Sequence, residues 1–404
     1  MTKHYVIVGG GVAAVHAAKA IRDQDAESEI SILGEESQLP YNRIKLTKGL
    51  FTDLHSEKVL IKKEKWYSDN RISVKTSTRI SSVHLDRQIV VTEDGQSVSY
   101  HKLLLCMGAK NRTLSLEGFG LNNVHTLRDV NDADRLKENL QDGSHVAVIG
   151  GGVQGIETAW ALHEAGYQVT VIEAFHRLMG RQLDEKSSQL LKENLEQAGV
   201  KVILQADVAS ITGTEYVTGI TLHDQSHFSC DHVVYSIGIV PNTELVSGSS
   251  IQVQQGIIVN EQMQTNDPHV YAAGDVAEVN GHVEGLWGGA IEQGRIAGSN
   301  MVANLTAYRR AVPVTLFNAF GISLFSIGNV DEQYCDTVVS GEENGAYTRV
   351  YVKDNTMIGA ISWQGAAASL GYKTAVEQGI PLMGVDVNGS SIVEIMAEVQ
   401  TRLN

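Results

Sequence analysis

Gly9-Gly10-Gly11-Val12-Ala13-Ala14 is one of two stretches that decide the fold of this chain, and Gly150-Gly151-Gly152-Val153-Gln154-Gly155 is the other. Each follows a short strand-like run, at residues 5–8 and 145–149, and each opens a run with helical apolar spacing. Glycines in this frame allow a tight turn and let backbone amides approach a pyrophosphate at the helix N-terminus. One such cluster alone is weak evidence, because glycine clusters also occur in ordinary turns at the ends of strands. Two copies predict two bound dinucleotides and electron transfer between them.

Bulk composition narrows the possible partners. The 404 residues are enough for two or three domains with their own cores. With 32 Lys and Arg against 47 Asp and Glu, the net charge is −15, which argues against a nucleic-acid partner because phosphate binding needs a basic face. No apolar run approaches the roughly 20 residues that span a bilayer, and the first strand begins almost at Met1, which leaves no room for a signal segment. We therefore expect no membrane association and a cytoplasmic location.

The cysteines offer no sign of a disulfide or metal framework. Cys106, Cys230 and Cys335 lie far apart and form no C-x-x-C pair. We therefore expect no metal and no disulfide scaffold, and we expect all three to be small buried residues.

Strand and helix patterns alternate along most of the chain, as in α/β folds with parallel sheets. The prediction is two Rossmann-like dinucleotide-binding domains, the second inserted into the first, and an α+β C-terminal domain. The expected segments are 1–111 and 238–310 for the first domain, 112–237 for the inserted domain and 311–404 for the last. Other expected elements are a hairpin around 80–91, helices at 131–141, 184–197, 290–305 and 369–378, and strands at 256–259, 314–317, 322–327, 347–352 and 357–363.

An acidic residue follows each glycine cluster at the distance expected for a ribose ligand, about 20 residues on. In the first domain this residue is Glu35, with Glu36 as a neighbour that is alternatively only a solvated turn residue. In the second it is Glu173, whose carboxylate would accept from a free 2′-hydroxyl and repel a 2′-phosphate. NADH is therefore expected over NADPH, although His176 and Arg177 follow and could reach a 2′-phosphate.

The stretch Leu39-Pro40-Tyr41-Asn42-Arg43-Ile44-Lys45-Leu46-Thr47-Lys48 resembles the L-P-Y-x-R-x-x-L-S-K segment of the FAD-dependent pyridine nucleotide-disulfide oxidoreductases. The subgroup that it resembles holds rubredoxin and ferredoxin reductases and the flavoprotein part of nitrite reductases. The resemblance implies that Arg43 and Lys48 border the flavin, with Lys48 near its N5 edge. Ile44 and Lys45 replace prolines common in that family. The alternative is that these basic residues are solvated on a helix.

Three further segments agree with that family. Leu103-Leu104-Leu105-Cys106-Met107-Gly108-Ala109 looks like its A-T-G strand end, with Cys106-Met107 in place of Ala-Thr. Ala273-Gly274-Asp275 resembles its A-x-G-D motif, which implies that Asp275 binds the ribityl chain. A helix beginning near Trp287 would stabilise negative charge at the flavin N1–C2=O edge by roughly 0.3–2 kcal/mol. Trp287 would contact the ring or the docked nicotinamide, or would only pack.

Within the second domain the resemblance implies that Glu157 faces the flavin and pairs with Lys48 where the nicotinamide docks; alternatively it is a surface residue. Gly238 lies in a segment that resembles the strand returning to the flavin domain. The residues expected to hold FAD or NADH are Gly9, Gly11, Val12, Ala13, Ala14, Glu35, Arg43, Lys48, Gly108, Asp275, Trp287, Gly150, Gly152, Val153, Gln154, Gly155, Glu173 and Gly238.

No cysteine lies at residues 42–51, where disulfide reductases of this superfamily carry a redox pair. Without a thiolate, attack on a disulfide is disfavoured. The expected function is transfer of electrons from NADH through FAD to a separate carrier: rubredoxin, a ferredoxin or a nitrite reductase component. The alternatives are an NADH oxidase or diaphorase with oxygen or a small acceptor, and a redox-sensing regulatory flavoprotein. Lys62, Lys63 and Lys65 form either a basic docking surface or a solvated face, and we expect a monomer or homodimer.

Overall fold

The computed structural model describes residues 3–303, 305–343 and 345–403. Contacts divide the chain into two units. Unit 1 comprises Met1–Arg112 and Gly238–Arg310, and unit 2 comprises Thr113–Ile237 and Ala311–Asn404. In the described part of the chain, no helix is long and apolar enough to cross a membrane.

Unit 1 is built on a five-stranded parallel sheet. Its strands, in spatial order, are β19 (Val270–Ala272), β7 (Lys102–Leu105), β1 (His4–Val8), β2 (Glu29–Leu33) and β3 (Ile72–Lys75). The central strand has no polar face, since Tyr5, Val6 and Ile7 are all fully buried. Continuous apolar runs of this kind are typical of parallel strands covered on both faces.

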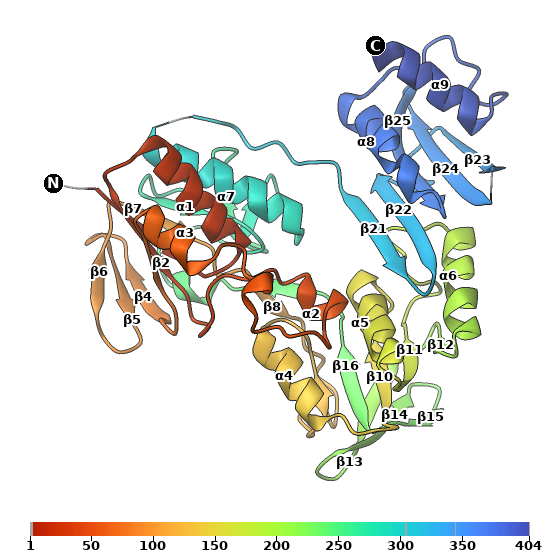
Figure 1. Ribbon diagram of the computed structural model, residues 1–404, viewed down its shortest axis with the longest axis horizontal. Helices are drawn as coiled ribbons and strands as arrows, with labels where there is room; N and C mark the ends of the chain where they lie inside the picture. The colour runs from red at the N-terminus through yellow and green to blue at the C-terminus, as the bar shows by residue number, and fades with distance from the viewer. Residues whose placement is uncertain (1–2, 304, 344, 404) are drawn as a thin grey trace. The chain divides into compact units, whose positions relative to one another are not determined.

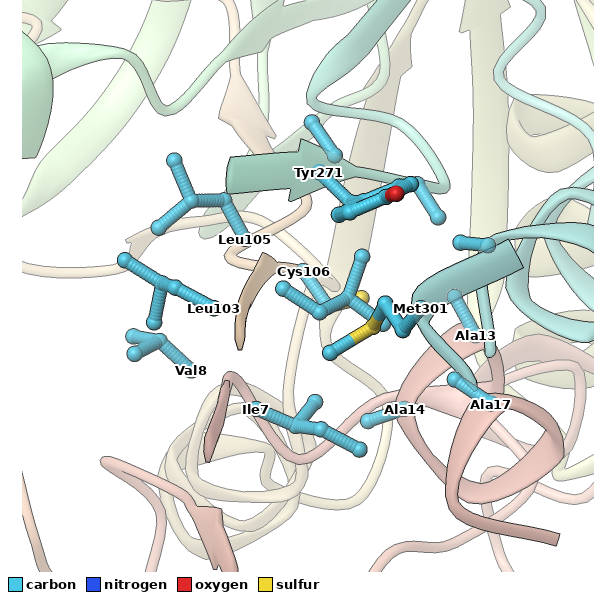
Figure 2. Packing of buried hydrophobic residues seen from close by; sticks show 14 of the residues in the cluster. Ile7, Val8, Ala13, Ala14, Ala17, Leu103, Leu105, Cys106, Tyr271 and Met301 are labelled. Atoms are coloured by element: carbon cyan, nitrogen blue, oxygen red, sulfur yellow. The ribbon is translucent and has the colours of Figure 1, made fainter. Parts of the chain in front are cut away.

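Two helices with small side chains, α1 (Val12–Gln24) and α7 (Trp287–Val302), lie side by side against this sheet (Figure 1). Their contact is backbone to backbone: a Cβ on Gly294 would lie 2.2 Å from the carbonyl oxygen of Ala13, and one on Gly298 would lie 2.3 Å from that of Ala17. Figure 2 shows Ala13 and Ala17 from α1 beside Met301 from α7, close to Cys106. This close approach brings residues nearly 300 positions apart in the chain together within unit 1.

The rest of unit 1 consists of short elements. A three-stranded antiparallel sheet combines β4 (Ile80–His84), β5 (Ile89–Thr92) and β6 (Ser97–Ser99). Where the chain leaves and re-enters the unit, β8 (Ala109–Asn111) pairs antiparallel with β17 (Ile239–Pro241). The remaining elements are α2 (Lys45–Lys48), η1 (Glu57–Val59), α3 (Glu64–Asp69), η2 (Glu244–Val246) and the parallel pair β18 (Ile257–Val259) and β20 (Ala277–Val279).

Unit 2 begins with a second parallel sheet. Its strands, in spatial order, are β12 (Lys201–Ile203), β11 (Gln168–Ile172), β10 (His145–Ile149), β16 (His232–Tyr235) and β9 (Val124–His125). The accompanying elements are α4 (Val130–Asn139), α5 (Val153–Glu164), α6 (Glu185–Gln197) and a three-stranded sheet of β13 (Val208–Gly213), β14 (Val217–Leu222) and β15 (His227–Ser229). The predicted helices at 131–141 and 184–197 correspond to α4 and α6 within two residues.

The C-terminal part of unit 2 is an antiparallel sheet with two helices. Its strands, in spatial order, are β21 (Val314–Ala319), β22 (Ile322–Gly328), β25 (Thr356–Trp363), β24 (Ala346–Lys353) and β23 (Thr337–Glu343). The short η3 (Ala366–Ala368) leads into α8 (Ser369–Gln378), and α9 (Ile392–Leu403) follows. Phe325, Val350, Tyr372 and Ile395 from these elements share one core. The predicted fold class, two parallel-sheet dinucleotide folds and an α+β part, is confirmed.

Some details of the prediction were wrong. Strand β23 and helix α9 were not predicted: β23 carries a Ser-Gly-Glu-Glu segment on an edge strand, and its pattern is too polar to stand out. Helix α7 begins at Trp287, the start expected from the family resemblance, and so three residues before the range 290–305 that was also expected for it. It also ends at Val302, short of residue 305. Cys335 is not buried; it is only partly covered, and its thiol contacts the carbonyl of Glu332.

Candidate dinucleotide sites

The first glycine of each turn is required by the protein itself. Gly9 has φ +111°, and a Cβ there would lie 2.2 Å from the carbonyl oxygen of Cys106 on the neighbouring strand. Gly150 repeats this, with φ +111° and a Cβ 2.3 Å from the carbonyl oxygen of Ser236. Only glycine satisfies both the left-handed backbone and the close approach.

The third position of each turn is different. A Cβ on Gly11 or on Gly152 would meet no described atom within 4 Å, and neither residue has a positive φ. Nothing in the described protein therefore requires glycine there. Each residue is the N-cap of its helix, and as a glycine it has no side chain to cap that helix end. A pyrophosphate seated on the helix N-terminus would explain both observations, so these residues fit the predicted dinucleotides.

The two turns differ at the sixth position of the motif, which is Gly155 in unit 2 and Ala14 in unit 1. A Cβ on Gly155 would lie 1.9 Å from the carbonyl oxygen of Gly150, so α5 starts pressed against its own turn. In unit 1 the corresponding residue is Ala14, which is fully buried. Val12 and Ala13 are also buried in the first turn of α1, whereas Val153 is only partly buried in α5. The side chain of Gln154 donates to the carbonyl of Leu127 at 2.7 Å, so this side chain anchors the chain ahead of α4.

Replacing Gly11 with alanine tests whether this glycine is needed for the ligand and not for the fold. We expect the apoprotein to keep its stability within about 1 kcal/mol, because the new methyl group meets no protein atom. FAD binding should weaken at least about tenfold, because the methyl would occupy the place of the pyrophosphate. Calorimetric titration of apoprotein with FAD measures the affinity and thermal unfolding the stability. Unchanged FAD affinity in a folded variant would contradict this assignment.

The two acidic residues after β2 have different surroundings. Glu35 is mostly exposed, and its Oε1 lies 3.6 Å from Arg79 Nη1. Glu36 is not a solvated turn residue: it is largely covered, and it accepts hydrogen bonds from Tyr41 Oη at 2.7 Å and from the guanidinium of Arg43. Arg43 is therefore held by a carboxylate of its own unit. Glu35 stays the prediction for the ribose ligand.

A pocket of about 700 Å³ opens at the carboxyl ends of β2 and β3. Its lining includes Leu33, the turn of residues 75–79, and polar residues of the β4–β6 sheet. Thr78 N donates to the carbonyl of Gly34, so this turn is fixed directly to the chain ahead of Glu35. Ligands of open α/β sheets bind at this edge, and the pocket is large enough for an adenosine group. None of these pocket residues was expected from the sequence, although Thr76-Ser77-Thr78 after an apolar strand was a usable signal.

Distant segments of unit 1 meet the first glycine turn at the same sheet edge. Ala273 N donates to the carbonyl of Leu105, which places Asp275 just beyond the end of β7. Gly274 N donates to the buried Gln293 Oε1 at 2.8 Å, and a Cβ on Gly274 would lie 3.3 Å from that of Ala13. The structure thus brings the A-x-G-D motif, the start of α1 and helix α7 together.

Three other predicted residues of this group have separate surroundings. Gly108 has φ +66°, and its carbonyl accepts from Asn242 N. Trp287, the first residue of α7, is half-buried and packs on the unit 1 core, so it has the packing role at least. Gly238 has φ +105°, and its carbonyl accepts from Arg112 N where the chain crosses between units.

The two residues predicted to pair at the nicotinamide belong to different units. Lys48 is exposed on α2 of unit 1, and Glu157 is partly buried on α5 of unit 2.

The ribose carboxylate predicted for unit 2 is held at the glycine turn. Glu173 Oε2 accepts from Gly151 N at 2.5 Å and Oε1 accepts from Phe175 N at 2.9 Å. Met179 N donates in turn to the carbonyl of Gly151, so the loop after β11 closes on the turn. A carboxylate in this position faces the edge where a nucleotide ribose would lie.

This chain belongs to the pyridine nucleotide-disulphide oxidoreductase family, which matches residues 3–294. Residues 313–380 match the rubredoxin NAD+ reductase C-terminal domain. The resemblance drawn from the sequence, including its rubredoxin reductase subgroup, is therefore confirmed.

Individual relatives support the same family assignment. The chain is 37% identical over 274 residues to a rubredoxin-NAD(+) reductase of Pseudomonas putida, covering 67% of this chain and 71% of that one. It is 34% identical over 363 residues to the nitrite reductase [NAD(P)H] of Bacillus subtilis (strain 168), covering 89% of this chain but only 45% of that protein. The chain thus spans about half the length of this relative. A ferredoxin reductase for the CYP199A2 system from Rhodopseudomonas palustris superposes with a TM-score of 0.87 at 25% identity, covering 96% of this chain and 99% of that one.

Proposed function

We propose that this protein is an FAD-containing oxidoreductase that passes electrons from NADH to a separate carrier protein of the rubredoxin, ferredoxin or nitrite reductase type. The observation that carries the proposal is the pair of turns in which Gly11 and Gly152 leave room for a ligand and a carboxylate follows at the same sheet edge. When bound, FAD would accept two electrons from NADH and release them singly to a one-electron acceptor. Residues 1–111 and 238–310 would hold FAD, and residues 112–237 would hold NADH.

The residues of the chain supply binding and orientation. The amides at the start of α1 and α5 would hold the two pyrophosphates, and Glu35 and Glu173 would hold the riboses. Asp275 would hold the ribityl chain, and the N-terminus of α7 would favour negative charge at the flavin N1–C2=O edge. Lys48 and Glu157 are the proposed pair at the nicotinamide. Orientation of this kind accelerates a transfer without an acid–base residue.

The thiols do not favour internal disulfide chemistry. Burial raises the pKa of Cys106, and burial with the nearby Asp231 raises the pKa of Cys230 to about 12. Burial also raises the pKa of Cys335. Reactive cysteines have lowered pKa values instead. This supports an external electron acceptor. All three cysteines are also free, as is usual for cytosolic proteins, and we propose a cytoplasmic location.

The lysine cluster does not identify the acceptor. Lys63 lies 2.8 Å from Glu57 and Lys65 lies 3.0 Å from Asp69, while Lys62 Nζ sits 5.4 Å from the ring centroid of Trp66. Carboxylates thus offset much of the positive charge, which favours the solvated face over a basic docking surface.

The proposal is tested by NADH oxidation with purified carriers. We expect yellow protein with bound FAD, and cytochrome c reduction that rises strongly when a rubredoxin or ferredoxin is added. Oxygen consumption that matches NADH oxidation without any carrier would instead indicate an oxidase. Colourless protein that takes up no FAD would overturn the proposal.

Replacing Lys48 with methionine should slow flavin reduction by NADH roughly tenfold, because one charged donor beside the nicotinamide would be lost. FAD should stay bound, since Lys48 is exposed on α2 and lies outside the glycine turn. Stopped-flow absorbance at the flavin band measures the rate. Lys45→Met, an exposed lysine of the same helix, is the matched control. Equal rates in the two variants would remove Lys48 from the mechanism.

A further inference from the structure

We propose that Glu185 sets the preference for NADH over NADPH by holding Arg177 and His176 away from the position of a 2′-phosphate. The inference rests on the proposed function and identifies what makes the second site selective. Glu173 repels a 2′-phosphate, whereas His176 and Arg177 in the loop after it could attract one. Whether they are free to do so depends on Glu185, with which both pair.

The loop is anchored at the nucleotide edge. Both oxygens of Glu173 accept backbone amides, from Gly151 and Phe175, and Met179 N donates to the carbonyl of Gly151 at 2.8 Å. His176 and Arg177 lie between these anchors. Both therefore lie within a few residues of the proposed ribose carboxylate, on a loop whose two ends are hydrogen-bonded to its surroundings.

Both groups converge on one carboxylate oxygen. Glu185 Oε2 lies 3.5 Å from His176 Nε2 and 3.8 Å from Arg177 Nη1. Arg177 Nη2 also donates to the carbonyl of Gly180 at 3.0 Å. The guanidinium is therefore engaged on two sides, by a carboxylate at the start of α6 and by its own loop. A phosphate would have to compete with Glu185 for it.

Other charged groups nearby are engaged elsewhere or belong to the same loop. Lys186, next in α6, pairs with Glu342 and lies over the ring of Tyr347. Arg181 follows the loop and is exposed. Glu185 is thus the carboxylate that the structure places on both candidate phosphate ligands. With Glu185 in place, the nucleotide edge presents the carboxylate of Glu173, while His176 and Arg177 are both paired with Glu185. This arrangement suits a free 2′-hydroxyl.

The test replaces Glu185 with glutamine and measures binding of NADH and NADPH to the FAD-loaded protein by calorimetry. Exposed ion pairs are weak, so we expect the dissociation constant of NADPH to fall about threefold to fivefold, while that of NADH stays within about twofold. In the background of Arg177→Met the same substitution should give no gain for NADPH. That double-variant cycle isolates the link between Glu185 and Arg177.

Glu193→Gln is the matched control, because Glu193 is an exposed glutamate of the same helix and pairs with Gln189. A gain in NADPH affinity equal in both variants would reflect net charge alone and would overturn the inference. An unchanged NADPH-to-NADH ratio in Glu185→Gln, with lowered thermal stability, would show a helix-end role and also overturn it. If neither variant nor wild type binds NADH, the proposed function itself fails.

Discussion

Replacing Gly294 with alanine is expected to disrupt unit 1 and to abolish retention of FAD. The new Cβ would lie 2.2 Å from the carbonyl oxygen of Ala13 and 2.8 Å from its Cα. These are backbone atoms of a neighbouring helix, so no side-chain rotation relieves the overlap, and α1 and α7 must move apart. We expect a loss of about 3 kcal/mol or more in the free energy of unfolding. Because α1 begins at the glycine turn, the pyrophosphate site moves with it.

Urea unfolding of the apoprotein and the FAD content of purified protein measure this effect. Gly288→Ala is the control for the unfolding measurement, because it makes the same change in the same helix where a Cβ meets no described atom within 4 Å. There the apoprotein should be unchanged or up to about 1 kcal/mol more stable, since alanine favours a helix over glycine. If Gly294→Ala behaves like Gly288→Ala, the close crossing of α1 and α7 is wrong.

Replacing Asp184 with alanine is expected to destabilise unit 2 by about 3–5 kcal/mol, the cost of breaking a buried ion pair from one side. The side chain of Asp184 is only 1% exposed. It caps α6 through Ser187 N, and its other oxygen accepts from Tyr347 Oη at 3.0 Å and Arg349 Nη1 at 2.8 Å. These last two residues lie on β24, so one carboxylate joins the nucleotide fold to the C-terminal sheet. Its loss leaves Arg349 paired with the half-exposed Glu332 but without its buried partner.

Hydrogen exchange followed by mass spectrometry, which reports each unit separately, checks this result. The control is Glu332→Gln: Glu332 also pairs with Arg349, at 2.7 Å, but is 55% exposed, so the loss should stay below about 1 kcal/mol. Comparable losses in the two variants would contradict the buried ion pair as the main link.

The same carboxylate gives unit 2 a defined response to acid. Burial alone would raise the pKa of Asp184, but hydrogen bonds from Ser187, Arg349 and Tyr347 outweigh it and hold the pKa below its usual 3.8. The ionised form is thus stabilised by folding. Its contribution is complete above pH 3.8 and is lost as the pH falls through the lower folded value.

Short-range patterns predicted the elements on which the proposed sites are built. The turn at Gly150 and the strand before it are local, and their φ angles and apolar runs follow from adjacent residues. The carboxylate of Glu173 could be found by counting from the turn, because strand and helix lengths limit where the next strand ends. Edge strand β23 lacked such a signal, since its residues are polar and its pairing is the main reason that it is extended.

Pairings between individual side chains could not be predicted in this way, even where the partners lie within eight residues of each other. The sequence allows Glu36 to be a solvated turn residue, and only the structure shows that it holds Arg43 and Tyr41. Similarly, the sequence indicates that Arg177 could bind a phosphate, and only the structure shows that Glu185 of α6 lies against it. Which carboxylate meets which cation depends on how helices and loops pack, and many sequence neighbours offer the same charge.

By itself, the sequence determined that this chain has two strand–turn–helix units for dinucleotides and no redox cysteine beside the first, because glycine geometry and residue chemistry are local properties. Tertiary structure alone decided that α7 lies close enough to α1 to require Gly294, and that one buried aspartate joins α6 to the C-terminal sheet. Contacts of this kind form between residues more than 150 positions apart, where backbone packing rather than chain order sets the distance.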